Sequence, residues 1–389
     1  PLRPTRPSPF FASSFAMQQV YFLIPGLILP TEAKSAISTC SLETADKLSK
    51  SLIEAPIRQD FGSLPFSRSV HLIWAWSVLC RRALPFVTAP YVWSVNQGPQ
   101  LANEVWSLTL AHADDEGRLA AVDPLTDEAV EAFACAMTVP LREHGFQLQR
   151  WDRTLFLTRK RPWGVATRPF EALSGHAPDA RVDLAASTED ASAVDAAVRD
   201  MNELNAALAS AALTSASTPI NALWISGGGC YSNFYPPTKI RSVLSDIDAI
   251  TGWALAAGIL NHRLGHITNA QQWPSDAPNG ECIAVLDALY EPWLARNWAL
   301  WESRLEGVVE QIDVLSQAAR KKGCDHAVLV GCGETMTMTL VKKNNNPRSL
   351  LARLAGGRKV AAASWIFQDP MSNTVNTAAA DTARDGGAL

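Results

Sequence analysis

The feature that most constrains the fold is an apolar run that stops at three consecutive glycines. Residues 219–229 read Pro-Ile-Asn-Ala-Leu-Trp-Ile-Ser-Gly-Gly-Gly. A short, nearly continuous apolar run of this kind is typical of a strand buried on both faces, as in a parallel sheet covered by helices. In open α/β sheets, ligands and catalytic groups gather at the carboxyl ends of the strands. The run therefore predicts an α/β fold and directs the search for a site to the glycines that end it.

Strand-like and helix-like segments alternate in the second half of the chain. After a long Ala- and Leu-rich helix over residues 192–213, strands are expected at 241–244, 282–286 and 326–330. Between the last two, apolar residues recur at helical spacing from Trp298 to Leu315, which predicts an amphipathic helix. Thr alternates with Met and Leu at 335–341, as in a half-exposed edge strand. The alternation predicts an α/β C-terminal lobe with a mostly parallel sheet flanked by helices.

The first half of the chain mixes the two kinds of element less regularly. Strands are expected at residues 20–29, 87–95, 105–111 and 118–122, with a helix within residues 66–83 and a hairpin-like pair at 146–148 and 154–158. Thr126 is a suitable N-cap for a helix whose first turn is acidic. We therefore expect an α+β N-terminal lobe over residues 17–165 and the α/β C-terminal lobe over residues 166–372.

Both ends of the sequence lack an apolar period. Residues 1–16 contain four prolines, two arginines and no acid. They are expected to be a disordered extension ahead of a natural start at Met17, the alternative being an organelle transit peptide. Residues 373–389 are small and polar, and a disordered tail is expected there.

Composition argues against several classes of protein. The formal net charge is -4, so there is no overall positive field and nucleic-acid binding is not expected. The longest apolar runs, residues 20–29 and 72–80, are shorter than the roughly 20 residues of a membrane helix. The seven cysteines form no Cys-x-x-Cys pair, which is typical of reduced thiols, although a reactive Cys332 between two glycines is conceivable. We expect a cytoplasmic protein that binds no nucleic acid, no membrane and no cofactor.

The candidate ligand-binding residues follow predicted strands. They are Gly227, Gly228, Gly229, Tyr231, Asp246 and Asp287. The glycines would either admit a ligand or simply form a turn, and the tyrosine would supply an apolar wall. The two carboxylates could bind a cation, act as acid and base, or cap the helices that follow. Because they repel anions, this pocket would favour a neutral or cationic small molecule, or a basic side chain of a protein partner. The sequence assembles no catalytic set.

Other chemistry-bearing residues have simpler structural interpretations. His262 and His266 have the spacing of a metal-binding helix face, but Gly265 between them disfavours a helix and a surface loop is expected. The aromatic residues between Tyr290 and Trp301 are expected to be core rather than a binding platform. The basic residues between 342 and 359 are expected to form a solvated face. No metal site is predicted.

Several short motifs resemble the bacterial RpfE-type regulatory proteins, which are often labelled phosphoglycerate-mutase-like. The motifs are Leu-Ile-Pro-Gly-Leu at residues 23–27, Asn-Ala-Leu-Trp at 221–224, Asp246 followed by Gly252, and Val-Leu-Asp at 285–287. The resemblance implies a cytosolic bacterial protein linked to the regulation of secreted virulence factors. The mutase label implies a metal-dependent phosphotransferase with an Asp at the end of its first strand, where this chain has Pro25 and Gly26.

Two classes of function follow. We favour a non-catalytic cytosolic regulatory or binding protein on an α/β scaffold, with a small molecule or a protein as its partner. The alternative is a metal-dependent phosphoryl-transfer enzyme, either phosphoglycerate-mutase-like or a phosphatase. Acids and histidines that converge at the strand ends would favour the enzyme.

Overall fold

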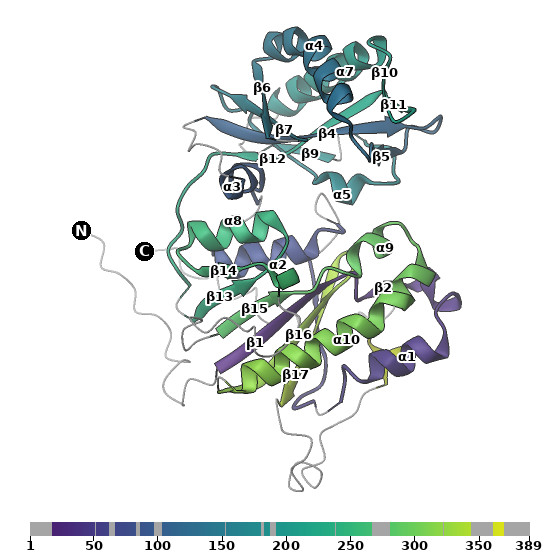
Figure 1. Ribbon diagram of the computed structural model, residues 1–389, viewed down its shortest axis with the longest axis vertical. Coiled ribbons are helices and arrows are strands. Elements are labelled where there is room, and N and C mark those ends of the chain that lie inside the picture. The colour runs from purple at the N-terminus through teal and green to yellow at the C-terminus, as the bar shows by residue number, and fades with distance from the viewer. Residues whose placement is uncertain are drawn as a thin grey trace, which may run out of the picture.

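Two sheets in two lobes organise the chain. The computed structural model describes residues 18–50, 52–61, 67–82, 86–96, 103–151, 153–179, 183–186, 192–237, 239–266, 281–321, 323–343 and 361–368. One lobe contains a seven-stranded sheet and lies below the other in the view of Figure 1. We call them the lower and the upper lobe. The predictions of a disordered extension at residues 1–16 and a disordered tail at residues 373–389 concern segments outside the described residues.

The lower lobe is built on a mostly parallel sheet, as predicted. Its strand order is β14 (Leu260–His262), β13 (Ile240–Leu244), β15 (Glu281–Val285), β1 (Gln18–Pro25), β16 (Cys324–Cys332), β17 (Met336–Lys343) and β3 (Ile57–Asp60). The first five strands are parallel, and β17 and β3 are antiparallel to their neighbours. The strand predicted at the edge, β17, is second from the edge because β3 pairs with it. The fold is therefore α/β.

Helices cover both faces of this sheet. On one face lie α1 (Thr39–Asp46), α9 (Tyr290–Leu294) and α10 (Trp298–Lys321), and on the other α2 (Val70–Leu79) and α8 (Asp248–Ala256). Alternate side chains of β1 point to opposite faces, so Phe22 and Ile24 pack on the α10 side while Leu23 packs on the α2 side. This two-sided burial explains why β1 reads as a continuous apolar run. Short elements complete the lobe: β2 (Leu29–Pro30), η2 (Thr31–Ser35), η3 (Leu264–His266), η4 (Ala362–Ser364) and β18 (Phe367–Gln368).

The upper lobe is an antiparallel sheet with its two long helices on one face. The strands run in the order β12 (Ala222–Gly229), β4 (Glu104–Ala113), β7 (Thr154–Arg159) and β6 (Phe146–Trp151), with β5 (Leu119–Ala121) beside β4. Helices α4 (Asp127–Glu143) and α7 (Ser192–Ser210) pack on it. The predicted cap is confirmed, since Thr126 Oγ1 accepts a hydrogen bond from the Ala129 amide at 3.2 Å. The remaining elements are β8 (Val165–Thr167), α5 (Phe170–Leu173), β9 (Leu184–Ala186), β10 (Leu213–Ser215) and β11 (Thr218–Ile220).

The segment predicted as a strand at 87–95 is instead the helix α3 (Ala89–Val95). Pro90 lies in its first turn, where a missing amide hydrogen does no harm. The helix packs between the lobes: a Cβ on Gly252 of α8 would come 2.6 Å from the Tyr91 carbonyl oxygen, and Trp93 meets Phe156 of β7 at 5.2 Å between ring centroids. Burial on two sides explains the uniformly apolar sequence that suggested a strand.

The two sheets do not follow the division of the chain expected at residue 165. The lower sheet takes β1 and β3 from the first 60 residues and its other strands from residues 240–343, while the upper sheet is made from residues 104–229. The upper lobe is thus inserted between two parts of the lower one. The cause is strand pairing: β1 is buried on both sides between β15 and β16, so the first strand of the sequence needs partners from its last third. Such pairing leaves no trace in local composition.

Among the described residues, every helix is too short or too polar to span a bilayer.

Candidate functional site

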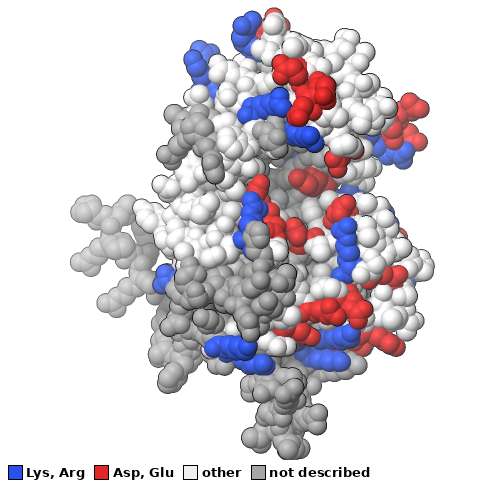
Figure 2. Space-filling model, in the orientation of Figure 1, with Lys and Arg blue, Asp and Glu red and all other residues white. Residues whose placement is uncertain are grey.

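The carboxyl edge of the lower sheet faces the upper lobe. Strands β13, β15, β1 and β16 all end there, and α5 of the upper lobe lies above α9 (Figure 1). The space-filling view shows the surface hollowed between the two lobes, with acidic side chains on both walls (Figure 2). We call this region the interlobe cleft. It is the position at which α/β sheets usually hold their ligands.

The end of β1 is closed by tryptophans. Gly26 has a φ of +73°, and a Cβ there would come 2.8 Å from the Trp293 Cβ. Trp293 Nε1 donates to the Ile28 carbonyl at 3.0 Å and Trp301 Nε1 donates to the Gly26 carbonyl at 2.8 Å. Both indoles are buried, and the half-buried Tyr290 and Trp298 pack against the same core, so the predicted aromatic cluster contributes to the core. The place where a first-strand Asp would stand is filled by packing, and the cleft lies over β13 and β15.

Two of the predicted site residues do meet at this edge. Asp246 follows β13 and is exposed, and its Oδ2 accepts a hydrogen bond from the Gly265 amide at 2.9 Å. Asp287 follows β15 and is half-buried. Burial raises the pKa of Asp287, and the nearby charge of Asp246 raises it further. Neither carboxylate caps a helix by a hydrogen bond that the described residues show; Asp248 lies in the first turn of α8 and pairs with Arg263 at 2.6 Å.

A half-buried tyrosine lies beside these acids. The Tyr290 hydroxyl, at the start of α9, donates to the Arg68 carbonyl at 2.9 Å, and its ring meets His71 of α2 edge-on at 4.6 Å. Burial lowers the pKa of His71 to about 3, so that imidazole is neutral. Burial also raises the pKa of Tyr290 well above its usual value, and the carboxylate of Glu171 on α5 adds to the effect. This interaction links Tyr290 of α9 to α5, which lies above α9 in Figure 1.

The arginines of the cleft are paired with acids. Arg68 Nε lies 3.3 Å from Glu334 Oε1, and Arg68 also bridges the lobes by donating to the Ser174 carbonyl at 3.2 Å. Two further pairs are Arg168 with Asp183 at 3.0 Å and Arg296 with Glu32 at 2.7 Å. Burial lowers the pKa of His176, and the charges of Arg68 and Arg296 lower it further. The positive charges near the cleft are therefore already balanced.

Three carboxyl groups are not balanced in this way. Asp246, Asp287 and Glu171, which we call the cleft acids, form no ion pair with any residue that the structure describes. Glu171 is exposed to the cleft, yet the surrounding protein raises the pKa of its carboxyl. A carboxyl group that is removed from water without a partner of opposite charge favours its protonated form.

The other predicted site residues lie elsewhere. Gly227, Gly228 and Gly229 end β12, which belongs to the antiparallel upper sheet, so the rule for carboxyl ends of parallel strands does not apply to them. A Cβ would overlap Thr88 at the first and the Trp106 ring at the second, and would come 2.7 Å from Val87 at the third. These glycines thus allow close packing at the lobe junction rather than an open rim.

The fourth of these residues, Tyr231, also lies at the lobe junction. Its ring lies 5.1 Å from the ring of Tyr91 in α3, measured between centroids. The same loop packs at the carboxyl end of α8, where the Phe234 amide donates to the Ala256 carbonyl at 2.9 Å. Asp246 precedes the opposite end of that helix. The structure therefore does not bring Tyr231 together with the two acids.

The donors present do not fit a dinuclear metal centre. Within the described residues, no three His, Cys, Asp or Glu side chains come together as a metal site would require. His262 closes β14 and His266 lies in η3, so the two do not share a helix, as predicted. Burial raises the pKa of Cys332, which keeps its thiol protonated and unreactive.

Sequence reasoning missed the upper-lobe half of the cleft. Glu171 lies on a four-residue helix, too short to show an apolar period, and Arg68 is placed by a backbone with a φ of +67° that no pattern announces. The available signal was indirect, because a segment rich in Gly, Pro and His, such as residues 162–183, is typical of a linker. The described part of this segment instead includes α5, which lies above α9 at the sheet edge.

Comparison with known proteins gives distant similarities only. No protein-family model matches the sequence, and no curated protein matches it. Among solved structures, a cofactor-independent phosphoglycerate mutase from Thermoplasma acidophilum is 11% identical over 90% of this chain and 98% of its own, with a TM-score of 0.38. A protein from Pyrococcus horikoshii is 11% identical over 85% of this chain and 88% of its own, with a TM-score of 0.45. At these values the chain resembles both proteins in outline, and neither similarity carries an activity over to it.

Proposed function

We propose that the protein is a non-catalytic binding protein with a regulatory role, and that its interlobe cleft binds a small organic cation. The observation that supports this is the charge balance of the cleft. Each arginine described there has an acidic partner, whereas the three cleft acids, two from the lower lobe and one from the upper, have none. An amine would pair with carboxyl groups that have no partner of opposite charge among the described residues.

The position of the cleft supports a regulatory role. A ligand between Asp287 and Glu171 would contact both lobes, which now meet here through the hydrogen bond from Arg68 to the Ser174 carbonyl. A cation that pairs with acids on both walls stabilises the arrangement in which the walls are close. Binding energy would in this way fix the relative position of the lobes.

The protonation of the cleft acids gives the proposal a pH signature. The surrounding protein raises the pKa of both Asp287 and Glu171. A cation binds the ionised carboxylates, so it competes with protons and binds more tightly as the pH rises through these raised pKa values. Binding of an anion at the same place would weaken over the same range. The direction of the pH effect therefore distinguishes the two kinds of ligand.

Titration calorimetry with spermidine tests the proposal. We expect saturable binding that is tighter at pH 8 than at pH 5. The double variant Asp287→Asn, Glu171→Gln should lose about tenfold or more in affinity, since each charge-assisted contact contributes about 1.5–3 kcal/mol. A matched control, Glu306→Gln with Glu310→Gln on α10, removes the same two charges away from the cleft and should bind as the unchanged protein does.

Two results would contradict the proposal. Equal losses in the two double variants would show that spermidine responds only to overall charge. Saturable binding of Mn²⁺ that depends on Asp246 and Asp287, together with hydrolysis of a phosphomonoester, would instead support the alternative of a metal-dependent phosphoryl-transfer enzyme.

A further inference from the structure

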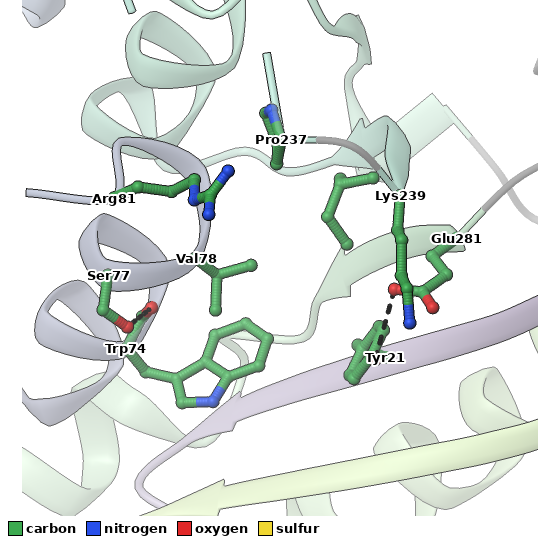
Figure 3. Close-up of a pocket in the computed structure, with 9 residues that line it drawn as sticks. Tyr21, Trp74, Ser77, Val78, Arg81, Pro237, Lys239 and Glu281 are labelled. Carbon is green, nitrogen blue, oxygen red and sulfur yellow. Dashed lines mark hydrogen bonds between the residues drawn. The ribbon is translucent and has the colours of Figure 1, made fainter. Parts of the chain in front are cut away.

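A second cavity lies at the opposite, amino edge of the same sheet. It has a volume of about 280 Å³ and is bounded by β1, α2 and the starts of β13 and β15 (Figure 3). We call it the amino-edge pocket, and its principal residues are Tyr21, Trp74, Val78, Arg81, Lys239 and Glu281. We propose that this pocket binds a small planar aromatic carboxylate that carries a hydrogen-bond donor at its far end. The proposal is independent of the interlobe cleft.

The floor of the pocket is aromatic. Tyr21 points to the α2 side of the sheet because it alternates with Phe22, which points to the other face. Its ring lies 5.9 Å from the ring of Trp74, at an interplanar angle of 49°. Val78 is one turn further along α2 and therefore stands beside Trp74. Such a floor accepts a flat, apolar ring by offset or edge contacts.

One wall is polar and buried. Glu281, the first residue of β15, is 9% exposed and accepts a hydrogen bond from the Tyr21 hydroxyl at 3.3 Å. Burial raises the pKa of Glu281, while the charge of Lys239 and the bond from Tyr21 lower it. In Figure 3 the Lys239 ammonium lies beside this carboxylate, so the two charges offset each other. A ligand N–H donor pointing to this wall would meet a carboxylate that is held in place.

The opposite side carries a cation with no such balance. Arg81 comes from the end of α2 and reaches into the mouth of the pocket (Figure 3). It is exposed, and no acidic side chain of the described chain pairs with it. Its φ is +53°, a left-handed conformation that glycine usually supplies just after a helix. An arginine at this position carries a conformational cost of about 1 kcal/mol relative to glycine.

These features together define the ligand. One unbalanced positive charge matches one carboxylate, the aromatic floor matches a ring, and the buried acid matches a donor. The cavity is slightly smaller than the usual range of about 300–1,000 Å³ for ligand sites, so it suits a one- or two-ring molecule. The compound 4-aminobenzoate has all three features in one plane and serves as the probe.

The first test compares three probes by titration calorimetry or ligand-observed NMR. We expect 4-aminobenzoate to bind saturably to the full chain. Aniline, which lacks the carboxylate, and cyclohexanecarboxylate, which lacks the flat ring and the amine, should each bind about tenfold or more weakly. Absence of saturable binding of 4-aminobenzoate, or equal binding of all three probes, overturns the proposal.

The second test uses three variants. Arg81→Gly should weaken 4-aminobenzoate binding by about tenfold while leaving the protein at least as stable, because glycine suits the backbone there. Glu281→Gln should weaken it severalfold. Arg241→Gln removes a cation from an exposed position on the neighbouring strand β13 and should change nothing. If Arg81→Gly and Arg241→Gln bind the probe equally well, Arg81 does not hold the carboxylate and the proposal fails.

Discussion

The two ends of α2 lie at opposite edges of one parallel sheet and face different surroundings. At the start of the helix, His71 is buried against Tyr290, and the neighbouring Arg68 is paired with Glu334. Just past its end, Arg81 is exposed beside a cavity and pairs with none of the acids that the structure describes. The first end is dry and electrostatically closed, and the second is open.

This contrast shows that the usual rule for α/β sheets, by which ligands bind at the carboxyl edge, applies only in part here. The carboxyl edge has the expected acids over β13 and β15, but the end of β1 is closed by Trp293 and Trp301. The amino edge, where ligands are not usually sought, has a cavity of about 280 Å³. Which strand ends remain open depends on what packs over them rather than on strand direction alone.

The largest expected effect tests whether the end of β1 is closed. Gly26→Ala should lower the free energy of unfolding by about 2–4 kcal/mol, because the new Cβ would overlap Trp293 and the backbone there is left-handed. Urea denaturation measures the change. A loss below 1 kcal/mol would mean that the tryptophans can move aside and that the β1 end can open.

Two other glycines separate the causes of that effect. Gly258 has a φ of +66° with open space around it, so Gly258→Ala should cost only about 1 kcal/mol. Gly307, within α10, has neither constraint, and Gly307→Ala should add up to about 1 kcal/mol of stability. The order of the three variants distinguishes steric closure from backbone conformation.

The second effect concerns the dry end of α2. His71 has a pKa of about 3 in the folded protein and about 6.5 when unfolded, so folding favours the neutral form. The neutral His71 imidazole therefore costs no stability above pH 6.5, and the free energy of unfolding falls as the pH drops from 6.5 towards 3. By pH 5 the loss is about 2 kcal/mol, at about 1.4 kcal/mol for each pH unit.

The variant His71→Leu cannot take up this proton. Its free energy of unfolding should therefore rise relative to that of the unchanged protein by about 2 kcal/mol between pH 7.5 and pH 5. Urea titrations of both proteins across this range measure the difference. Parallel pH profiles would show that His71 is accessible to protons and that this end of α2 is not dry.

The smallest effect compares two arginines in left-handed conformations. Arg81 follows α2 with a φ of +53°, and Arg296 follows α9 with a φ of +52°. Arg81→Gly should raise the free energy of unfolding by up to about 1 kcal/mol, since no ion pair is lost. Arg296→Gly loses the pair with Glu32, in which both side chains are about half exposed, so its gain should be smaller by about 0.5 kcal/mol. If Arg296→Gly gains more stability than Arg81→Gly, then Arg81 rather than Arg296 is the arginine with a stabilising ion pair.

Much of the local structure was predictable from the sequence. The cap at Thr126, the amphipathic α10 and the hairpin of β6 and β7 follow from spacing and residue type. Residues 87–95 were wrong as a strand because a short apolar run buried between two lobes has the same composition as a buried strand. The spacing of apolar residues does not distinguish a buried helix from a buried strand in segments of this length.

Only part of the candidate site could be predicted from the sequence. Asp246 and Asp287 could be placed at strand ends, and in the structure the charge of Asp246 raises the pKa of Asp287. The glycine triplet could not be assigned to its sheet, because an apolar run has the same appearance in β12 as in a parallel strand. Glu171 and Arg81 could not be found at all, since their positions follow from a short helix and from a backbone conformation.

The sequence by itself determined the class of fold, most of the helices and strands, and which face of these elements is apolar. The reason is that the spacing of apolar residues, helix caps and turn residues act over a few positions. Tertiary structure alone decided that β1 pairs between β15 and β16, that the upper lobe interrupts the lower one, and that α5 covers the sheet edge. The pairings of β1 join residues more than 250 positions apart, and the contact of α5 with α9 joins residues more than 100 positions apart. They depend on which buried surfaces fit together, and the order of residues along the chain does not record that fit.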